Sequence, residues 1–196
     1  MYKHVEFTID GIAPLLMHNV RLANPRDPIT RAMKAITAKG KKKTDADLDE
    51  LSRLEFMGGL YVGENGEPVV PGECIEAMLR KAAMKSRKGQ DALAGIISDG
   101  NWPLIYDGPK TADELWADGR FVDCRGAGVQ KSRVIRTRPR FNAWSLKFTV
   151  SYLPELINER ELIEWVETAG QLVGMLDFRP KFGRFLLRGQ KAVKAA

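Results

Sequence analysis

The sequence has few of the residues that carry the chemistry of most enzymes. Its 196 residues include only two cysteines and two histidines. Cys74 and Cys124 lie far apart and lack the CxxC or CxxH spacing of a zinc site or a disulfide framework. We therefore expect reduced thiols, no metal site and no cofactor.

Long apolar runs are also absent. No apolar stretch approaches the roughly 20 residues that a membrane span requires. The N-terminal residues MYKHVEFTIDG lack the apolar core of a secretory signal. Hydrophobic residues make up 44% of the chain and charged residues 29%, which is ordinary for a folded protein. The sequence therefore predicts a folded, cytoplasmic protein without a membrane partner.

Acidic residues are missing from two segments that are rich in arginine and lysine. Residues 125–140 contain six cations and no acid, and residues 179–194 contain six more cations and no acid. The other 19 cations of the chain are outnumbered by its 25 acids, although the net charge of the whole is +6. Such local basicity indicates a polyanionic partner, and the alternative is a solvated charged surface.

Alternation and periodicity predict an α+β fold. Polar and apolar residues alternate over 4–9 and 144–152, which predicts strands with one buried face. Helical periodicity predicts amphipathic helices over 45–57, 75–83 and 159–173. Further strands are expected over 134–141 and 184–188, and a hairpin around Asn65-Gly66. A ferredoxin-like antiparallel sheet with helices on one face and insertions is the simplest packing of these elements.

We interpret residues 1–196 as a single domain with an insertion at about 13–57 and a basic C-terminal tail. The first part of the insertion contains Pro14, Pro25 and Pro28, which we expect to break any helix there. A cluster of lysines follows at 39–43. Long irregular segments of this kind are usually functional or disordered.

The segment KSRVIRTRPRF, residues 131–141, contains five cations and no carboxylate. In an extended strand, Arg136, Arg138 and Arg140 would share one face at a spacing of about 7 Å, close to the phosphate repeat of a stretched single strand. Arginine can bind phosphate oxygens and stack on a base. Pro139 cannot donate a ladder hydrogen bond, so we expect a sheet edge or a strand end. A charged edge that resists aggregation is the alternative.

Three segments resemble the RAMP superfamily of CRISPR proteins. VVPGECIEAMLRKAA (69–83) resembles its strand, Pro-Gly turn and helix, although Glu73, Cys74 and Glu76 replace the usual small and basic residues. GMLDFRPKFGRF (174–185) resembles its C-terminal glycine-rich loop, and GIAPLLMHN (11–19) is similar to its first strand and loop. The likeness extends to the backbone subunits that polymerise along a guide RNA and to phage and prophage proteins with this pattern. It implies an RRM-like ferredoxin core and binding of single-stranded nucleic acid.

Catalysis is an alternative that this resemblance also raises, because nuclease-like members use a histidine or a loop aspartate. His18 follows Pro14, and Asp27 lies in NPRDPITR. These two residues are the candidates for an RNA endonuclease.

We predict a non-catalytic protein that binds single-stranded DNA or RNA with little sequence preference and self-associates along the strand. A protein-interaction module of phage or CRISPR origin is the second hypothesis. DNA and RNA are not distinguished, because both present the same phosphates. We expect the two basic segments to form one groove, with Phe141 and Phe182 stacking on bases. The predicted contacts are Lys41, Lys42, Lys43, Arg125, Lys131, Arg133, Arg136, Arg138, Arg140, Phe141, Arg179, Lys181, Phe182, Arg184 and Arg188.

Overall fold

The structure, a computed structural model, describes residues 1–129 and 132–193. The chain forms two units: the first contains Met1–Leu15, Val69–Asp107 and Phe141–Ala196, and the second contains Leu16–Pro68 and Gly108–Arg140. The sequence predicted one domain with one insertion at about 13–57. In the structure a second excursion, 108–140, joins the first excursion in a unit of its own. Each unit is described separately below.

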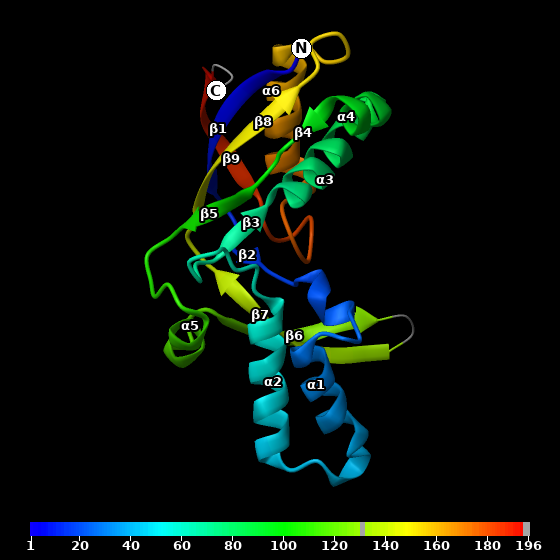
Figure 1. Ribbon diagram of the computed structural model, residues 1–196, viewed down its shortest axis with the longest axis vertical. Coiled ribbons are helices and arrows are strands. Elements are labelled where there is room, and N and C mark those ends of the chain that lie inside the picture. Colours follow the sequence, from blue (N-terminus) through cyan, green and yellow to red (C-terminus); the bar gives the residue numbers. More distant parts are fainter. Residues whose placement is uncertain (130–131, 194–196) are drawn as a thin grey trace. The chain divides into compact units, whose positions relative to one another are not determined.

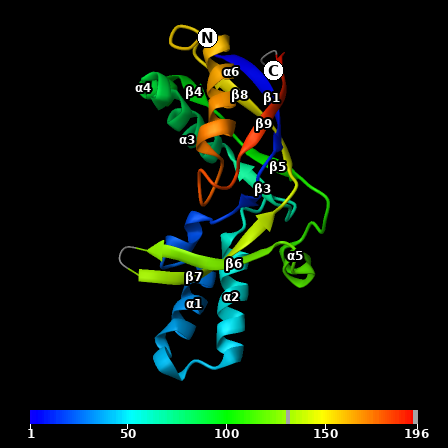
Figure 2. The same ribbon diagram turned by 180° about the vertical axis from the view of Figure 1, so that it is seen from behind.

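The first unit is a ferredoxin-like antiparallel sheet with helices on one face, as the sequence predicted (Figures 1 and 2). The strand order is β3-β5-β8-β1-β9, and β4 also pairs with β8. Helices α3 and α6 pack against each other on the covered face. The strands are β1 (Lys3–Gly11), β3 (Val69–Pro71), β4 (Ile96–Ile97), β5 (Asn101–Ile105), β8 (Ser145–Tyr152) and β9 (Phe185–Val193). The helical segments are α3 (Gly72–Ala83), η3 (Met84–Ser86), α4 (Gly89–Gly95), α6 (Glu159–Thr168) and the π-helical η4 (Ala169–Val173).

The core of the first unit lies between the sheet and its helices. The apolar face of β1 is buried, and Phe7 pairs in register with Phe148 of β8, the two rings lying 5.7 Å apart. Helix α3 buries Ile75, Met78 and Leu79 against this layer. Full burial of such a side chain contributes about 1.5–3 kcal/mol. The predicted alternation of β1 and β8 and the predicted apolar stripe of α3 are therefore confirmed.

The second unit combines helices with a three-stranded sheet of order β2-β7-β6. Helices α1 and α2 pack side by side (Figure 1). The helical segments are η1 (Val20–Ala23), α1 (Pro28–Ala38), η2 (Gly40–Lys42), α2 (Asp45–Gly59) and α5 (Ala112–Asp118). The strands are β2 (Leu15–Leu16), β6 (Val122–Val129) and β7 (Ser132–Phe141).

Helix α1 corrects the expectation that the prolines exclude a helix from this segment. Pro28 is the first helical residue, a position where its missing N–H costs nothing. Asp27 is the N-cap, and its side chain accepts hydrogen bonds from the backbone N–H groups of Ile29 and Thr30. Proline here starts a helix and does not end one.

The predicted start of α2 is confirmed, and the predicted hairpin around Asn65-Gly66 is confirmed only in part. Thr44 forms the predicted N-cap, within a reciprocal capping box with Asp47. The turn at Gly66 joins only an isolated bridge between Val62 and Pro68, because the next residues, Val69–Pro71, pair with β5. Across the described residues, no helix is long and apolar enough to cross a membrane.

Candidate nucleic-acid interface

The β6–β7 ribbon carries the first basic segment, and its register places a carboxylate among the arginines. In the backbone register of the ladder, Asp123 lies opposite Arg138, and Arg125 lies opposite Arg136. The Arg125 guanidinium donates two hydrogen bonds to the Asp123 carboxylate, and Arg140 Nη1 lies 3.6 Å from Asp123 Oδ2. The Asp123 side chain is almost fully buried. Two arginines of the segment therefore already have an anionic partner.

A second carboxylate reaches the ribbon from helix α2. Glu55 is buried, and its Oε1 accepts a hydrogen bond from Arg136 Nη1 at 2.7 Å. Its Oε2 accepts the backbone N–H of Thr137 at 2.8 Å. Glu55 thus neutralises Arg136 and also satisfies a backbone group of β7.

One further prediction for β7 is wrong. Arg138 is only 6% exposed, so this side chain is withdrawn from any partner in solution and interrupts the expected row of phosphate contacts. For Pro139 the sequence predicted a sheet edge or a strand end, and the structure shows the second: Pro139 lies two residues before the end of β7, which is the middle strand of three, and its carbonyl accepts the Met17 N–H at 3.0 Å. Lys131 lies outside the described residues, and the Arg133 side chain is likewise not among those described.

The aromatic residues beside the cations are core residues, contrary to the stacking prediction. Phe141 is 0% exposed, and its ring packs at 4.8 Å, edge on, against the ring of Tyr106. Phe182 is also buried. Neither ring can stack on a base without leaving the core.

The second basic segment lies in the first unit, along the loop after η4 and strand β9. Arg188 pairs with Asp10 at 2.5 Å. Arg184 Nε donates to the backbone carbonyl of Pro180 at 2.7 Å, which uses a guanidinium donor without cancelling its charge. Lys181 is exposed, and its Nζ lies 5.8 Å from the centre of the Phe182 ring.

The lysine cluster lies at the connection between α1 and α2. Lys41 and Lys42 are exposed and Lys43 is half-buried. Their neighbour Lys39 pairs with Asp47 at 2.5 Å. The hydrogen bond from Lys39, together with that from the Thr44 backbone, holds the pKa of Asp47 below its ordinary value.

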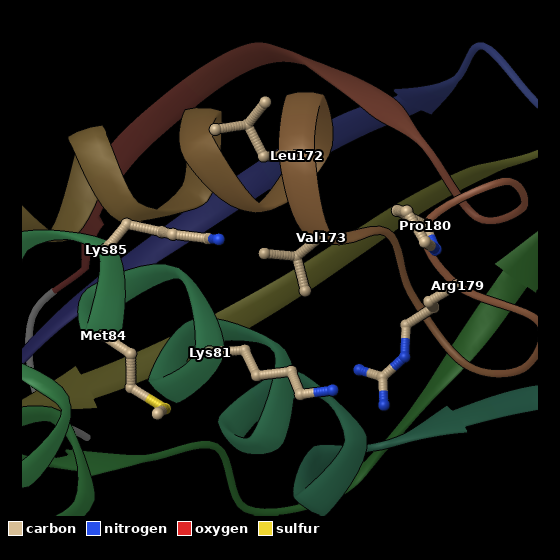
Figure 3. Close-up of a pocket in the computed structure, with 7 residues that line it drawn as sticks. All are labelled: Lys81, Met84, Lys85, Leu172, Val173, Arg179 and Pro180. Carbon is tan, nitrogen blue, oxygen red and sulfur yellow. The ribbon is translucent and has the colours of Figure 1, made fainter.

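Cations also surround a pocket of about 420 Å³ in the first unit (Figure 3). Lys81 comes from α3, Lys85 from η3 and Arg179 from the loop, and all three side chains line the hollow. Within residues 1–129 and 132–193, no carboxylate lies within ion-pair distance of these three cations. The remaining lining residues are Met84, Leu172, Val173 and Pro180. We call this site the basic pocket.

The glycine-rich loop that supplies Arg179 is held by backbone contacts. Gly183 donates its N–H to the Pro14 carbonyl at 2.8 Å, and its own carbonyl accepts the Met175 N–H at 2.9 Å. At Gly183 φ is +70°, and a Cβ there would lie 2.1 Å from the Met175 carbonyl oxygen. Only glycine fits this closure, which fixes the loop beside η4.

The sequence analysis missed Lys81 and Lys85 because α3 lies outside both basic segments. Their spacing nevertheless carries a signal. Residues four apart on a helix share a face, and Met84 lies between them on that face. The helix periodicity that identified the buried stripe of α3 could therefore have identified this second, basic stripe.

The face of the sheet opposite the helices is polar at the two central strands, β1 and β8. Lys147 pairs with Glu6 at 3.0 Å, and His4 Nδ1 lies 2.8 Å from the Ser151 hydroxyl. RRM domains read RNA with aromatic residues on such a face. At the central positions of β1 and β8 this face presents no aromatic residue, so the ferredoxin-like fold here lacks that stacking platform.

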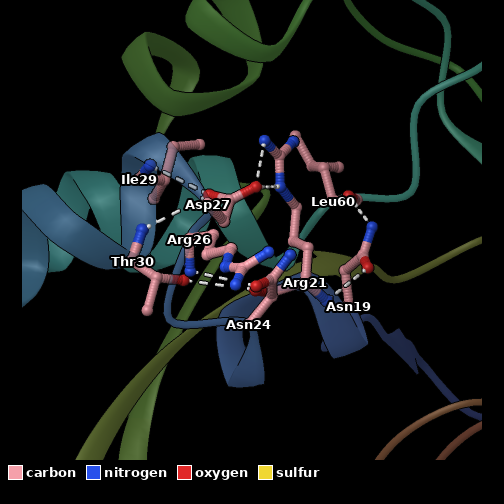
Figure 4. A network of polar contacts seen from close by, with 8 residues as sticks. All are labelled: Asn19, Arg21, Asn24, Arg26, Asp27, Ile29, Thr30 and Leu60. Atoms are coloured by element: carbon pink, nitrogen blue, oxygen red, sulfur yellow. Dashed lines mark hydrogen bonds and ion pairs between the residues drawn. The ribbon is translucent and has the colours of Figure 1, made fainter.

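Asp27, a candidate for cleavage, has a structural role in the second unit (Figure 4). Its Oδ2 accepts from Arg21 Nε at 2.9 Å, and its Oδ1 accepts the Ile29 N–H at 2.9 Å. Burial raises the pKa of Asp27, but the hydrogen bonds from Arg21, Thr30 and Ile29 outweigh it and hold the pKa below its ordinary value. The carboxylate therefore stays ionised as a helix cap.

His18, the other candidate, offers its backbone carbonyl to the Tyr61 hydroxyl at 3.4 Å. No group of three or more histidine, cysteine or acidic side chains that could hold a metal occurs among the described residues.

Comparisons with known proteins relate the chain to others through its fold. No family model matches the sequence, and no curated protein matches it. Among solved structures, 39 chains match. One belongs to the cryo-EM structure of the Type III-B Cmr-beta bound to cognate target RNA, with a TM-score of 0.54 and 13% identity. The match covers all of this chain and 62% of that chain. The shared fold agrees with the ferredoxin-like core that the resemblance to the RAMP superfamily implies.

Proposed function

We propose that this protein binds single-stranded nucleic acid through its phosphates, with little sequence preference, and that it self-associates along the strand. The observation that carries the proposal is the basic pocket, where Lys81, Lys85 and Arg179 converge with no carboxylate of the described residues within ion-pair distance. Contacts from lysine and arginine to phosphates supply affinity without reading bases. The fold shared with a chain of a complex bound to target RNA supports RNA as the strand.

The contacts of this proposal are ranked by the partners that each cation already has. The leading contacts are the three pocket cations together with Lys181 and Arg184, which form no ion pair with a carboxylate in the described part of the chain. Arg125, Arg136, Arg140 and Arg188 rank second, because each pairs with an aspartate or glutamate. Lys41, Lys42 and Lys43 form a separate basic surface in the second unit, and Lys131 and Arg133 remain contacts predicted from the sequence alone.

A binding titration tests the proposal. Labelled single-stranded RNA, single-stranded DNA and duplex of equal length are titrated with protein across a salt series. We expect tighter binding of the single strands than of the duplex, and a linear fall of log K with log salt, with a slope of about 0.7 per neutralised phosphate. A salt-independent affinity would contradict the proposal.

Charge reversal locates the interface. Arg179→Glu removes a pocket cation, and Lys3→Glu is the matched control at an exposed position at the start of β1. We expect Arg179→Glu to weaken strand binding by about tenfold or more and Lys3→Glu to weaken it much less. Equal effects of the two reversals would mean that binding depends only on net charge.

Self-association is measured on the same strands. Mass photometry with strands of increasing length should show complexes that grow by whole protein copies. A single copy on every length would contradict this part of the proposal and leave binding itself intact.

A further inference from the structure

One wall of the basic pocket is apolar, which phosphate binding alone does not require. Met84 is 61% exposed and Leu172 is 57% exposed, and both line the hollow beside the cations. Val173 and Pro180 continue this wall. A ligand that fits such a site combines negative charge with an apolar surface.

The size of the pocket limits the ligand further. Small-ligand sites measure about 300–1,000 Å³, and this pocket, at about 420 Å³, lies toward the lower end of that range. A hollow of this size suits one nucleotide and not an extended segment of a strand. A base has the flat apolar faces that pack on such a wall, and its phosphate supplies the negative charge.

The elements around the pocket are fixed to one another. Trp165 of α6 donates its indole N–H to the Ser86 hydroxyl at 3.2 Å. Lys88 pairs with Glu161 at 3.0 Å, next to the start of α6. These contacts tie η3 to α6, while Gly183 holds the loop that carries Arg179. The pocket is therefore preformed, which lowers the entropic cost of binding.

We infer that the basic pocket takes one nucleotide of the bound single strand. The base lies against Met84, Leu172 and Pro180, and the phosphate lies among Lys81, Lys85 and Arg179. The inference rests on the proposed function, since it names the part of the strand that this site receives. It follows that a mononucleotide occupies the pocket by itself and that the strand displaces it.

Methionine-methyl NMR tests this directly, because Met84 is an exposed methionine in the pocket wall. Protein labelled at its methionine methyl groups is titrated with adenosine 5′-monophosphate, ribose 5-phosphate and inorganic phosphate. We expect the adenosine nucleotide to shift the Met84 methyl signal through the ring current of its base. Ribose 5-phosphate and phosphate should leave this signal nearly unchanged, and the buried Met78 provides an internal reference.

Two pairs of variants separate the charged and the apolar contributions. Lys81→Glu should weaken binding of the nucleotide by about tenfold. Lys3→Glu is its charge-matched control. Leu172→Ser should weaken binding of the nucleotide. It should leave the slope of log K against log salt for strand binding unchanged. Leu93→Ser, at another exposed leucine of the first unit, is the control for Leu172→Ser. The Met78 signal in each variant reports whether the core is intact.

The outcomes distinguish this inference from the proposed function. A Met84 shift with the nucleotide that is displaced by the strand supports both. Strand binding without any Met84 response up to millimolar nucleotide overturns the inference and leaves the proposed function standing. A Met84 response in a protein that does not bind strands overturns both, and the pocket is then a site for free nucleotides.

Discussion

The β6–β7 ribbon and the basic pocket place positive charge in opposite ways. The ribbon contains six cations and no acid over residues 125–140, yet the buried Asp123 and Glu55 pair with three of its arginines. The pocket gathers cations from three segments, and among the residues that the structure describes no acid lies within ion-pair distance of them. Charge density along a chain is therefore a poor measure of charge density in the folded protein. Arginines of the ribbon hold the structure together, and the two lysines and one arginine of the pocket remain available.

The largest expected effect tests the structural role of the ribbon. Glu55→Ala removes the partner of Arg136 and leaves the Thr137 N–H unsatisfied. We expect a loss of about 2–3 kcal/mol in the free energy of unfolding, measured by urea denaturation, with strand affinity unchanged or increased because Arg136 is released.

The control for this prediction lies on the same helix. Glu50 pairs with Arg53 at 2.9 Å, and both side chains are partly exposed, unlike that of Glu55. Glu50→Ala should cost less than about 1 kcal/mol. If Glu55→Ala and Glu50→Ala cost the same, the arginines of the ribbon are not structural.

A smaller effect separates the two regions by salt dependence. Replacing Arg179 by alanine should lower the slope of log K against log salt by about 0.7, the value of one phosphate contact. Replacing Arg136 should lower it by less than half as much, because Arg136 already has Glu55 as its partner. Titrations of one labelled strand across a salt series measure both slopes, and equal decreases would refute the ranking of contacts.

The smallest effect concerns Asp27, whose pKa is lowered. A carboxyl with a lowered folded pKa adds stability above its unfolded pKa, and this is lost as the pH falls through the folded value. Asp27→Asn keeps a capping residue but weakens the pairing with Arg21. We expect its melting temperature to be about 1–3 °C lower at neutral pH, with the difference shrinking below about pH 4.

Thermal unfolding at neutral and acid pH measures this difference. The Asp27→Ala variant, which has no cap, should be less stable than Asp27→Asn at both. A difference between wild type and Asp27→Asn that persists in acid would show that the charge of Asp27 is not its source. Loss of an RNA-cleaving activity in Asp27→Asn would revive the endonuclease alternative.

The sequence was sufficient to predict those strands and helices in which one side is buried and the other is exposed. The alternation around Phe7 and Phe148 and the periodicity of Ile75, Met78 and Leu79 arise from one-sided burial, which sequence periods record directly. The cap at Thr44 is equally local. These features require no knowledge of distant residues.

The failures have non-local causes. The pairing of Arg140 depends on Asp123 in the adjacent strand, and the pairing of Arg136 depends on Glu55, which lies 81 residues away in the sequence. No spacing within 131–141 contains that information. The missed helix α1 has a different cause, because proline both ends and begins helices and only the cap from Asp27 distinguishes the two.

The sheet order of the first unit has a consequence for synthesis on the ribosome. Its last strand, β9, pairs with its first, β1, and the loop that carries Arg179 directly precedes β9. Since chains emerge from their N-terminus, β1 gains this neighbour only after about 170 further residues have been synthesised. A nascent chain that stops short of β9 lacks the edge strand of this sheet, so β1 keeps an unpaired edge until residues 185–193 have emerged.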